Sequence, residues 1–579
     1  MISRVRPALV VLVAVLGTAS LFLFAASPAR TPPTNERPKL AVLLVFDQLR
    51  GDYLARWERL FGDGGFRRLC GDGAWFQHCH YPYATTLTAP GHATISTGCP
   101  PETHGIVGNE WYDRAARKEA YCVGSDRHTQ VPPPVAKTDK EKAAASAAPT
   151  RLLADTLADA IKRQLGESAH VVALSLKDRS AVLPGGRTPD ACYWADKTGR
   201  FVTSTFYRDR PHDWVRDFNA SRFTDGWLDK QWTRLRPTLD YAAWSGPDDV
   251  RGESTGAEQG RTFPHPFDGG KKKSHEVYLT ELSTSPFGNE VLLTLAKRAI
   301  AAEGLGTRAT PDFLSLSFSS NDLVGHAWGP DSQEVLDTTL RTDRLLKDLL
   351  AHLDAQVGRG RYTVVLTADH GVCPLPEVSR SRGLDARRVE MPPLLAAAEA
   401  FLNTSYPAAA ETKKADTGKW IEATRSNMLY LNRTRCRERK VEPDQVAAAL
   451  ATWLSAQPGI ARAIPRGDLL RPTDRDELLT RVRRSFVPDR SGDVMLVHRK
   501  YDLLSWSTTG KEMTGTTHGS PYEYDTHVPL LAMGPGIVAG TRADRVSPEH
   551  ASLILAASLG VRPPQQARLT LPPRLFRSQ

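Results

Sequence analysis

The chain has 579 residues, of which 41% are hydrophobic and 24% charged, so it can bury a large core in several domains or in one domain with insertions. Its net charge is +10, but the basic residues are spread out and interleaved with acidic ones, which argues against a nucleic-acid partner. The seven cysteines include no CxxC pair, so a structural zinc site built from cysteines is not expected.

The N-terminus has the features of an export leader. Arg4 and Arg6 precede an apolar run from Ala8 to Ala26, and a stretch of small residues and then prolines follows. This pattern predicts a secretory signal peptide over residues 1–29 or, because the run is long, an uncleaved N-terminal membrane anchor. We therefore expect an exported protein, periplasmic or secreted, in which the cysteines could form up to three disulfides with one left over.

Short apolar runs that are typical of strands recur along the chain, with helical patterns between several of them. The helical patterns are clearest over residues 150–165, where leucine or isoleucine recurs every fourth residue, and over 334–357. Continuous apolar strands that alternate with helices predict an α/β fold with a mostly parallel central sheet flanked by helices. The runs interpreted as core strands are KLAVLLVFD (39–47), HVVALSLK (170–177), DFLSLSF (312–318), YTVVLTADH (362–370), DVMLVHR (493–499) and HVPLLAM (527–533).

Two long stretches interrupt this pattern. Residues 185–273 are rich in Asp, Trp, Arg and Gly without clear periodicity, and residues 376–492 contain a strand-like and a helical segment of their own. We interpret the first as an irregular insertion and the second as a cap-like insertion. Both would lie within one catalytic domain over residues 38–575.

Acidic residues and histidines gather where the predicted strands end. Asp47 ends the first strand, Asp322 and His326 follow the third, and Asp369 and His370 end the fourth, while His518 lies in a loop before the last. The carboxyl ends of parallel strands form the edge where α/β sheets bind ligands. Three Asp and three His at this edge predict two metal sites, and mixed carboxylate and imidazole ligands favour zinc over magnesium.

The segment TTLTAPGHATISTG (85–98) predicts a helix with Thr88 as its N-cap, Pro90 in its first turn and Gly98 as its terminating glycine. At that position a hydroxyl lies beside backbone N–H groups that favour an anion. Among the hydroxyls of this segment, Thr88 is therefore the candidate nucleophile.

Seven motifs appear in order between about residues 38 and 560. They are VFDQLRGDY (Asp47), YATTLTAPGHATISTG (Thr88), GIVGNEWYD (Asn109), LSLKDRSAVLPGG (Lys177 and Arg179), SNDLVGHAWGP (Asp322 and His326), LTADHGVCPLPE (Asp369 and His370) and GTTHGSPYEYDTHVPLL (His518). In this order they resemble the alkaline phosphatase superfamily, and among its members the PafA-like bacterial alkaline phosphatases, which use a threonine nucleophile and two zinc ions.

The resemblance implies an alkaline phosphatase that hydrolyses small-molecule phosphate monoesters through a phospho-threonine intermediate on Thr88, and a monomer. It implies that Asn109, Lys177 and Arg179 contact the non-bridging phosphate oxygens. The zinc ligands that it implies are Asp322, His326 and His518 for one ion, and Asp47, Asp369, His370 and the Thr88 oxygen for the other.

The sequence leaves three alternative functions, each of which fits it less well. Phosphodiesterases and nucleotide pyrophosphatases of the same superfamily lack the Lys-x-Arg pair, so Lys177 and Arg179 favour monoesters. Sulfatases require an Arg where Thr103 follows Cys99, which disfavours that reading. A non-enzymatic, exported metal-binding protein would not need Thr88 and the phosphate-contacting residues together.

Overall fold

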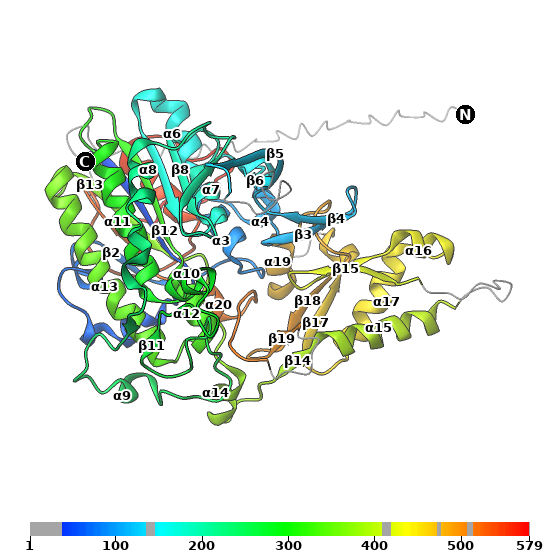
Figure 1. The fold of residues 1–579 in the computed structure, drawn as a ribbon. Helices are drawn as coiled ribbons and strands as arrows, with labels where there is room; N and C mark the ends of the chain where they lie inside the picture. The colour runs from blue at the N-terminus through cyan, green and yellow to red at the C-terminus, as the bar shows by residue number, and fades with distance from the viewer. Residues whose placement is uncertain (1–36, 135–144, 408–417, 472–475, 507–512, 578–579) are drawn as a thin grey trace, which may run out of the picture.

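The fold is built on one large sheet, which the computed structural model shows in strand order β21-β2-β20-β13-β1-β12-β7-β8-β9-β5-β6 (Figure 1). The structure describes residues 37–134, 145–407, 418–471, 476–506 and 513–577. The strands of this sheet, in chain order, are β1 (Leu40–Phe46), β2 (Ala74–Cys79), β5 (Gly124–Val131), β6 (Ala145–Ala147), β7 (Val171–Ser175), β8 (Ala191–Ala195), β9 (Phe201–Ser204), β12 (Asp312–Phe318), β13 (Tyr362–Thr367), β20 (Leu530–Met533) and β21 (Gly540–Val546).

The centre of the sheet is parallel. Strands β13, β1, β12, β7 and β8 pair in parallel, whereas β20 pairs antiparallel with β13, and β9 antiparallel with β8. Every residue of β1, β7, β12 and β13 is buried, as expected for parallel strands that are covered on both faces. The predicted α/β fold is confirmed, with antiparallel strands added on both flanks of the parallel centre.

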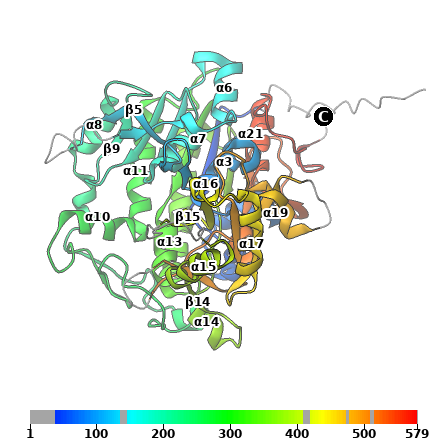
Figure 2. The same cartoon turned by 90° about the vertical axis from the view of Figure 1, so that its right-hand side faces the viewer.

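Helices cover both faces of the sheet, as the two perpendicular views show (Figures 1 and 2). One layer contains α11 (Pro286–Ala302), α12 (Ser320–Trp328) and α13 (Gln333–Leu353), and the other contains α3 (Thr88–Thr97), α7 (Asp178–Gly185) and α21 (His550–Leu559). The predicted helix over 150–165 begins later than expected, as α6 (Leu157–Leu165), because Thr156 caps it in a capping box with Asp159.

The first predicted insertion begins too early. Strands β8 and β9, which lie within residues 185–273, belong to the main sheet rather than to an irregular segment. The rest of this stretch contains only short elements, namely α8 (Asp213–Ala220), η5 (Phe223–Trp227), β10 (Gln231–Trp232), α9 (Tyr241–Ser245) and β11 (His265–Pro266).

The cap-like insertion has its own four-stranded sheet, in the order β15-β16-β18-β17, beside the main sheet (Figure 1). The run DVMLVHR, predicted as a core strand, is β18 of this second sheet, so the cap extends beyond residue 492. One face of the cap sheet, including Leu429 and Leu496, packs in a core of the cap's own. The other face, including Met428, Tyr430 and Met495, shares a core with residues of the main domain. The elements of the cap are α15 (Met391–Ser405), β15 (Ile421–Arg425), β16 (Met428–Leu431), α16 (Arg433–Glu438), α17 (Pro443–Ser455), β17 (Ile460–Pro465), α18 (Arg466–Leu469), α19 (Glu477–Arg484) and β18 (Val494–His498).

All seven cysteines lie among the described residues and are unpaired thiols, so the permitted disulfides do not form. Six are buried and Cys70 is half-buried. The predicted leader, residues 1–29, lies outside the described part of the chain. Within that part, no helix combines the length and apolar character needed to span a membrane.

Candidate metal centre and phosphate site

The parallel strands bring most of the predicted residues to one edge of the sheet. Asp47 follows β1, Asp369 and His370 follow β13, and Asp322 lies in the first turn of α12 after β12. Because β13, β1 and β12 are neighbours, these side chains meet, and all four are buried. The loop before β20 adds His518, whose Nε2 lies 3.6 Å from Asp322 Oδ1.

Two groups of ligand atoms could each hold a metal ion among the residues that the structure describes at this edge. One consists of Asp47, Asp369 and His370, and the other of Asp322, His370 and His518. His326 adjoins the second group, with its Nε2 3.1 Å from Asp322 Oδ1. The arrangement therefore brings all six predicted protein ligands into one cluster, although His370 lies near both groups.

The three histidines are oriented alike. Nδ1 of His326 lies 2.7 Å from the Thr516 carbonyl oxygen, Nδ1 of His518 lies 2.7 Å from that of Thr86, and Nδ1 of His370 lies 2.9 Å from that of Gly371. Such a carbonyl partner holds the proton on Nδ1 and leaves the Nε2 lone pair for a metal. This is the arrangement of metal-ligating histidines.

Two carboxylate oxygens of the cluster also fit metal ligation. Asp47 Oδ1 and Asp369 Oδ2 are buried and meet the hydrogen-bond geometry with no described residue, although His370 Nε2 lies 3.3 Å from the first and His92 Nδ1 3.2 Å from the second. Burying such atoms without a partner is costly unless they ligate a cation. With imidazole and carboxylate donors together, the cluster fits a zinc-like divalent ion.

The electrostatics of the cluster are those of crowded carboxylates. Burial, with the neighbouring Asp47, raises the pKa of Asp369. Burial also acts to raise the pKa of Asp47, but Lys177 and His370 contribute to holding that pKa below its ordinary value. Burial and the nearby His370 and His326 lower the pKa of His518, which keeps this imidazole neutral.

Lys177 lies within the carboxylate cluster. Its Nζ is 2.5 Å from Asp47 Oδ2 and 2.6 Å from Asp322 Oδ2, and it thereby links one carboxylate of each group. Lys177 immediately precedes α7, after the end of β7, next to β12 in the sheet. Lys177, which was expected to contact phosphate, therefore offsets the negative charge of Asp47 and Asp322 in this structure.

Thr88 is the first residue of α3 rather than its N-cap, which is Leu87. The predicted terminator, Gly98, has a left-handed φ of 68°. Thr88 Oγ1 lies 3.4 Å from His370 Nε2, so the hydroxyl adjoins the cluster at the start of a helix. Gly91 allows α3 to pack closely against the residues that follow β13, since a Cβ there would lie 2.2 Å from the Asp369 carbonyl oxygen.

Asn109 and Arg179 lie near this helix start. The Ala89 N–H donates to Asn109 Oδ1 at 2.9 Å, which fixes the amide beside the first turn of α3. Arg179 Nη1 donates to the Tyr121 hydroxyl at 3.4 Å, and that hydroxyl donates to Asp178 Oδ1 at 2.5 Å. Arg179 Nε is buried without a hydrogen-bond partner among the described residues.

Sequence reasoning missed Gln48. Its backbone N–H donates to Asp369 Oδ1 at 3.1 Å and its side-chain amide to Asp322 Oδ1 at 2.7 Å, so it joins carboxylates of both groups. It has a left-handed φ of 68°, which non-glycine residues adopt rarely and mostly at constrained sites. Gly325, inside α12, leaves room for it, because a Cβ there would lie 1.8 Å from Gln48 Oε1.

His92 was also missed. This buried ring places Nδ1 2.9 Å from the Thr88 carbonyl oxygen and 3.2 Å from Asp369 Oδ2, and Nε2 2.7 Å from Ser317 Oγ. Burial lowers the pKa of His92 to about 4, so the ring is neutral. It fixes the distance between α3 and the end of β13.

The cap reaches the same region through the turn between β15 and β16. Ser426 and Asn427 both have positive φ, as a tight hairpin turn requires. Ser426 Oγ donates to the Glu110 carbonyl oxygen at 3.3 Å, and Asn427 Nδ2 to that of Gly519 at 3.4 Å. The turn thus contacts the neighbours of Asn109 and His518.

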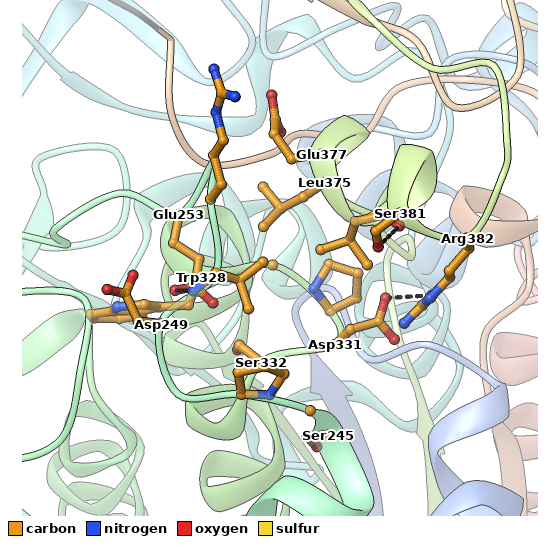
Figure 3. Close-up of a pocket in the computed structure, with 17 residues that line it drawn as sticks. Ser245, Asp249, Glu253, Trp328, Asp331, Ser332, Leu375, Glu377, Ser381 and Arg382 are labelled. Atoms are coloured by element: carbon orange, nitrogen blue, oxygen red, sulfur yellow. Dashed lines mark hydrogen bonds and ion pairs between the residues drawn. The ribbon is translucent and has the colours of Figure 1, made fainter.

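A cavity of about 380 Å³ lies elsewhere, between residues 245–253, the turn that joins α12 to α13, and α14 (Pro376–Ser381) (Figure 3). None of the described residues that line it belongs to the cluster. Its carboxylate Asp331 is paired with Arg56 at 2.8 Å and with Arg382 at 3.0 Å. This cavity is therefore distinct from the candidate metal centre.

Known proteins resemble this chain over most of its length. The family described as "Type I phosphodiesterase / nucleotide pyrophosphatase" matches residues 41–521. Alkaline phosphatase PafA of Elizabethkingia meningoseptica is 34% identical over 87% of this chain and 88% of its own length, and alkaline phosphatase PhoV of Synechococcus elongatus is 33% identical over 89% and 88%.

A crystal structure of wild-type alkaline phosphatase PafA superimposes with a TM-score of 0.84 at 31% identity, covering 95% of this chain and all of that one. The fold is accordingly alkaline-phosphatase-like. The chain belongs to the type I phosphodiesterase/nucleotide pyrophosphatase family of the alkaline phosphatase superfamily.

Proposed function

We propose that this protein is an exported, metal-dependent alkaline phosphatase that hydrolyses small-molecule phosphate monoesters. The observation that carries the proposal is that Thr88 Oγ1, at the start of α3, lies 3.4 Å from His370 in a metal-capable cluster that also contains Lys177. The similarity to proteins named alkaline phosphatase supports it.

The cluster would hold two zinc ions. One would be bound by Asp322, His326 and His518, and the other by Asp47, Asp369 and His370 with the Thr88 oxygen. When bound, the ions would lower the pKa of the Thr88 hydroxyl and stabilise the departing oxygen of the substrate. Gln48 and the carbonyl partners of the histidines would hold the ligands in place.

Thr88 would act as the nucleophile. Its hydroxyl lies at the first residue of a helix, where the helix dipole favours the negative charge of a phosphoryl group. Attack on phosphorus would form a Thr88–phosphate ester and break the bond to the leaving oxygen, with loss of the hydroxyl proton of Thr88 and gain of a proton by the leaving oxygen, so that the alcohol departs. Water then cleaves that ester, which releases phosphate and restores the hydroxyl.

Asn109, Lys177 and Arg179 would bind the phosphoryl oxygens. Two cations and one amide match the two charges of a monoester better than the single charge of a diester. Lys177 would have two roles, because its ammonium group also contacts Asp47 and Asp322 and so offsets part of the carboxylate charge of the cluster.

The test compares a monoester and a diester that share one leaving group. In a Lys177→Ala, Arg179→Ala variant, two charge-assisted contacts of about 1.5–3 kcal/mol each are lost, so kcat/KM for the monoester should fall about 10²- to 10⁴-fold. The diester rate should fall much less. A Lys197→Ala, Arg210→Ala variant, which removes two exposed cations, controls for net charge.

An equal loss for both substrates would overturn the monoesterase assignment. The phosphodiesterase function that the family description names would then be the better one.

A further inference from the structure

A second group of metal-capable side chains lies apart from the candidate active site. Among the described residues, the ligand atoms of His80, Glu523 and His527 all lie within 4.8 Å of one another. His80 follows β2, whereas Glu523 begins α20 (Glu523–Thr526) and His527 follows it. The three residues come from segments more than 440 positions apart in the sequence, which the fold joins through a β-bridge between His80 and His527.

Both imidazoles are oriented by partners at one ring nitrogen. His527 Nε2 lies 2.8 Å from the Gln77 carbonyl oxygen, which holds a proton on Nε2 and leaves the Nδ1 lone pair free to ligate. His80 Nδ1 lies 3.4 Å from Thr526 Oγ1, which leaves its Nε2. Metal-ligating histidines usually form a hydrogen bond of this kind through the ring nitrogen that does not bind the metal.

The His527 ring is also held in position by close packing. A Cβ at Gly51 would lie 2.6 Å from the His527 ring, and the Gly51 N–H donates to the His527 carbonyl oxygen at 3.0 Å. The rings of His80 and His527 stack with centroids 4.6 Å apart and an angle of 15°. Packing therefore holds the two imidazoles close together.

Glu523 completes the set with a carboxylate that is open to solvent. It lines two surface hollows, one shared with His80 and the other with His527. An ion held there would keep a coordination position accessible to water. Arg481 and Arg545 line the hollow that His80 and Glu523 share, so an ion held there would have two cations nearby.

We propose that His80, Glu523 and His527 bind one divalent transition-metal ion of the zinc class, separate from the two ions of the active site. Two imidazoles and one carboxylate with an open position form a known type of zinc site. The ion would fasten the end of β2 to α20. That turn supports the loop after His370, since Gly371 N–H donates to the Asp525 carbonyl oxygen at 2.7 Å and Val372 N–H to that of Tyr524 at 2.9 Å.

The test counts bound zinc. Full-length protein is equilibrated with Zn²⁺ at a free concentration held in the micromolar range by a metal buffer, and zinc per chain is measured by elemental analysis. A His80→Gln, Glu523→Gln variant should bind one equivalent less than the wild type. A His78→Gln variant, which changes an exposed histidine two residues away, should bind the same amount as the wild type.

The melting temperature in chelator shows whether the double variant folds, and it should match that of the wild type. Added Zn²⁺ should raise the melting temperature less in the double variant than in the wild type. Equal zinc content in wild type and double variant would overturn the proposal. The result is the difference in zinc content between the wild type and the double variant. It does not depend on the active-site ions, because their loss would lower the zinc content of both proteins equally.

Discussion

Lys177→Met tests whether this lysine balances the charge of the carboxylate cluster. Its side chain is 12% exposed and contacts Asp47, which is fully buried, and Asp322, which is 5% exposed. Removing one partner of a buried ion pair costs about 3–5 kcal/mol, because the remaining charge is left uncompensated. Unfolding entropy of about 2.1 cal/mol/K per residue converts this, for 579 residues, into a fall in Tm of about 2.5–4 °C.

Calorimetry of metal-stripped and zinc-loaded protein separates the two roles of Lys177. The metal-stripped variant should show the full loss, whereas the zinc-loaded variant should show little, because the ions replace the missing positive charge. Lys118→Met, which removes an exposed ion pair with Asp126, should change neither form measurably. An equal loss with and without zinc would refute the charge-balancing role.

The pH dependence follows from the same contacts. Burial acts to raise the pKa of Asp47, but the Lys177 contact contributes to holding it below its ordinary value, so the contact stabilises the folded state most fully above the unfolded pKa of about 4. That stabilisation is lost as the pH falls through the lowered pKa of the folded state. The difference in Tm between wild type and Lys177→Met should therefore be constant near neutrality and shrink below about pH 4.

Three further predictions concern the proposed chemistry. Thr88→Ala should lower kcat about 10³-fold or more without changing Tm appreciably, whereas Thr97→Ala at the other end of α3 should keep normal activity; acid-quenched phosphate on another residue would contradict this. Gln48→Leu should weaken zinc binding or activity about 10- to 100-fold, unlike the exposed Gln77→Leu, and unchanged zinc affinity and activity would rule out a positioning role. A chelator should abolish activity, and added zinc should restore it. Full activity of an Asp369→Ala, His370→Ala variant would exclude a metal requirement at this site.

The sequence predicted most accurately those site residues whose positions follow from the ends of parallel strands. Asp47, Asp322 and Asp369 were expected to meet because parallel strands end at one edge of a sheet, and an apolar run followed by Asp marks that edge without knowledge of pairing. The start of α3 was off by one residue. Leu87 provides no capping side chain, so no local signal separated the N-cap from the first helical residue.

The remaining errors concern non-local pairing. The apolar run of β18 is as hydrophobic as a core strand, and only its partners β16 and β17 place it in the cap. Strands β8 and β9 are four or five residues long in a Gly- and Asp-rich stretch, which hid them. Gln48 contacts Asp322, 274 positions away, and the available hint was Gly325 inside a helix, a residue that often marks a close approach.

The unpaired cysteines determine in which redox environments the chain can fold. With no covalent cross-link among the seven thiols, the folded state rests on packing and hydrogen bonds that a reducing environment leaves intact. Burial raises the pKa of Cys99 and of Cys70 to about 12, so neither becomes the thiolate that thiol–disulfide exchange requires. The same native structure is thus compatible with folding in a reducing environment and with activity in an oxidising one. Its folding requires no oxidoreductase or disulfide isomerase.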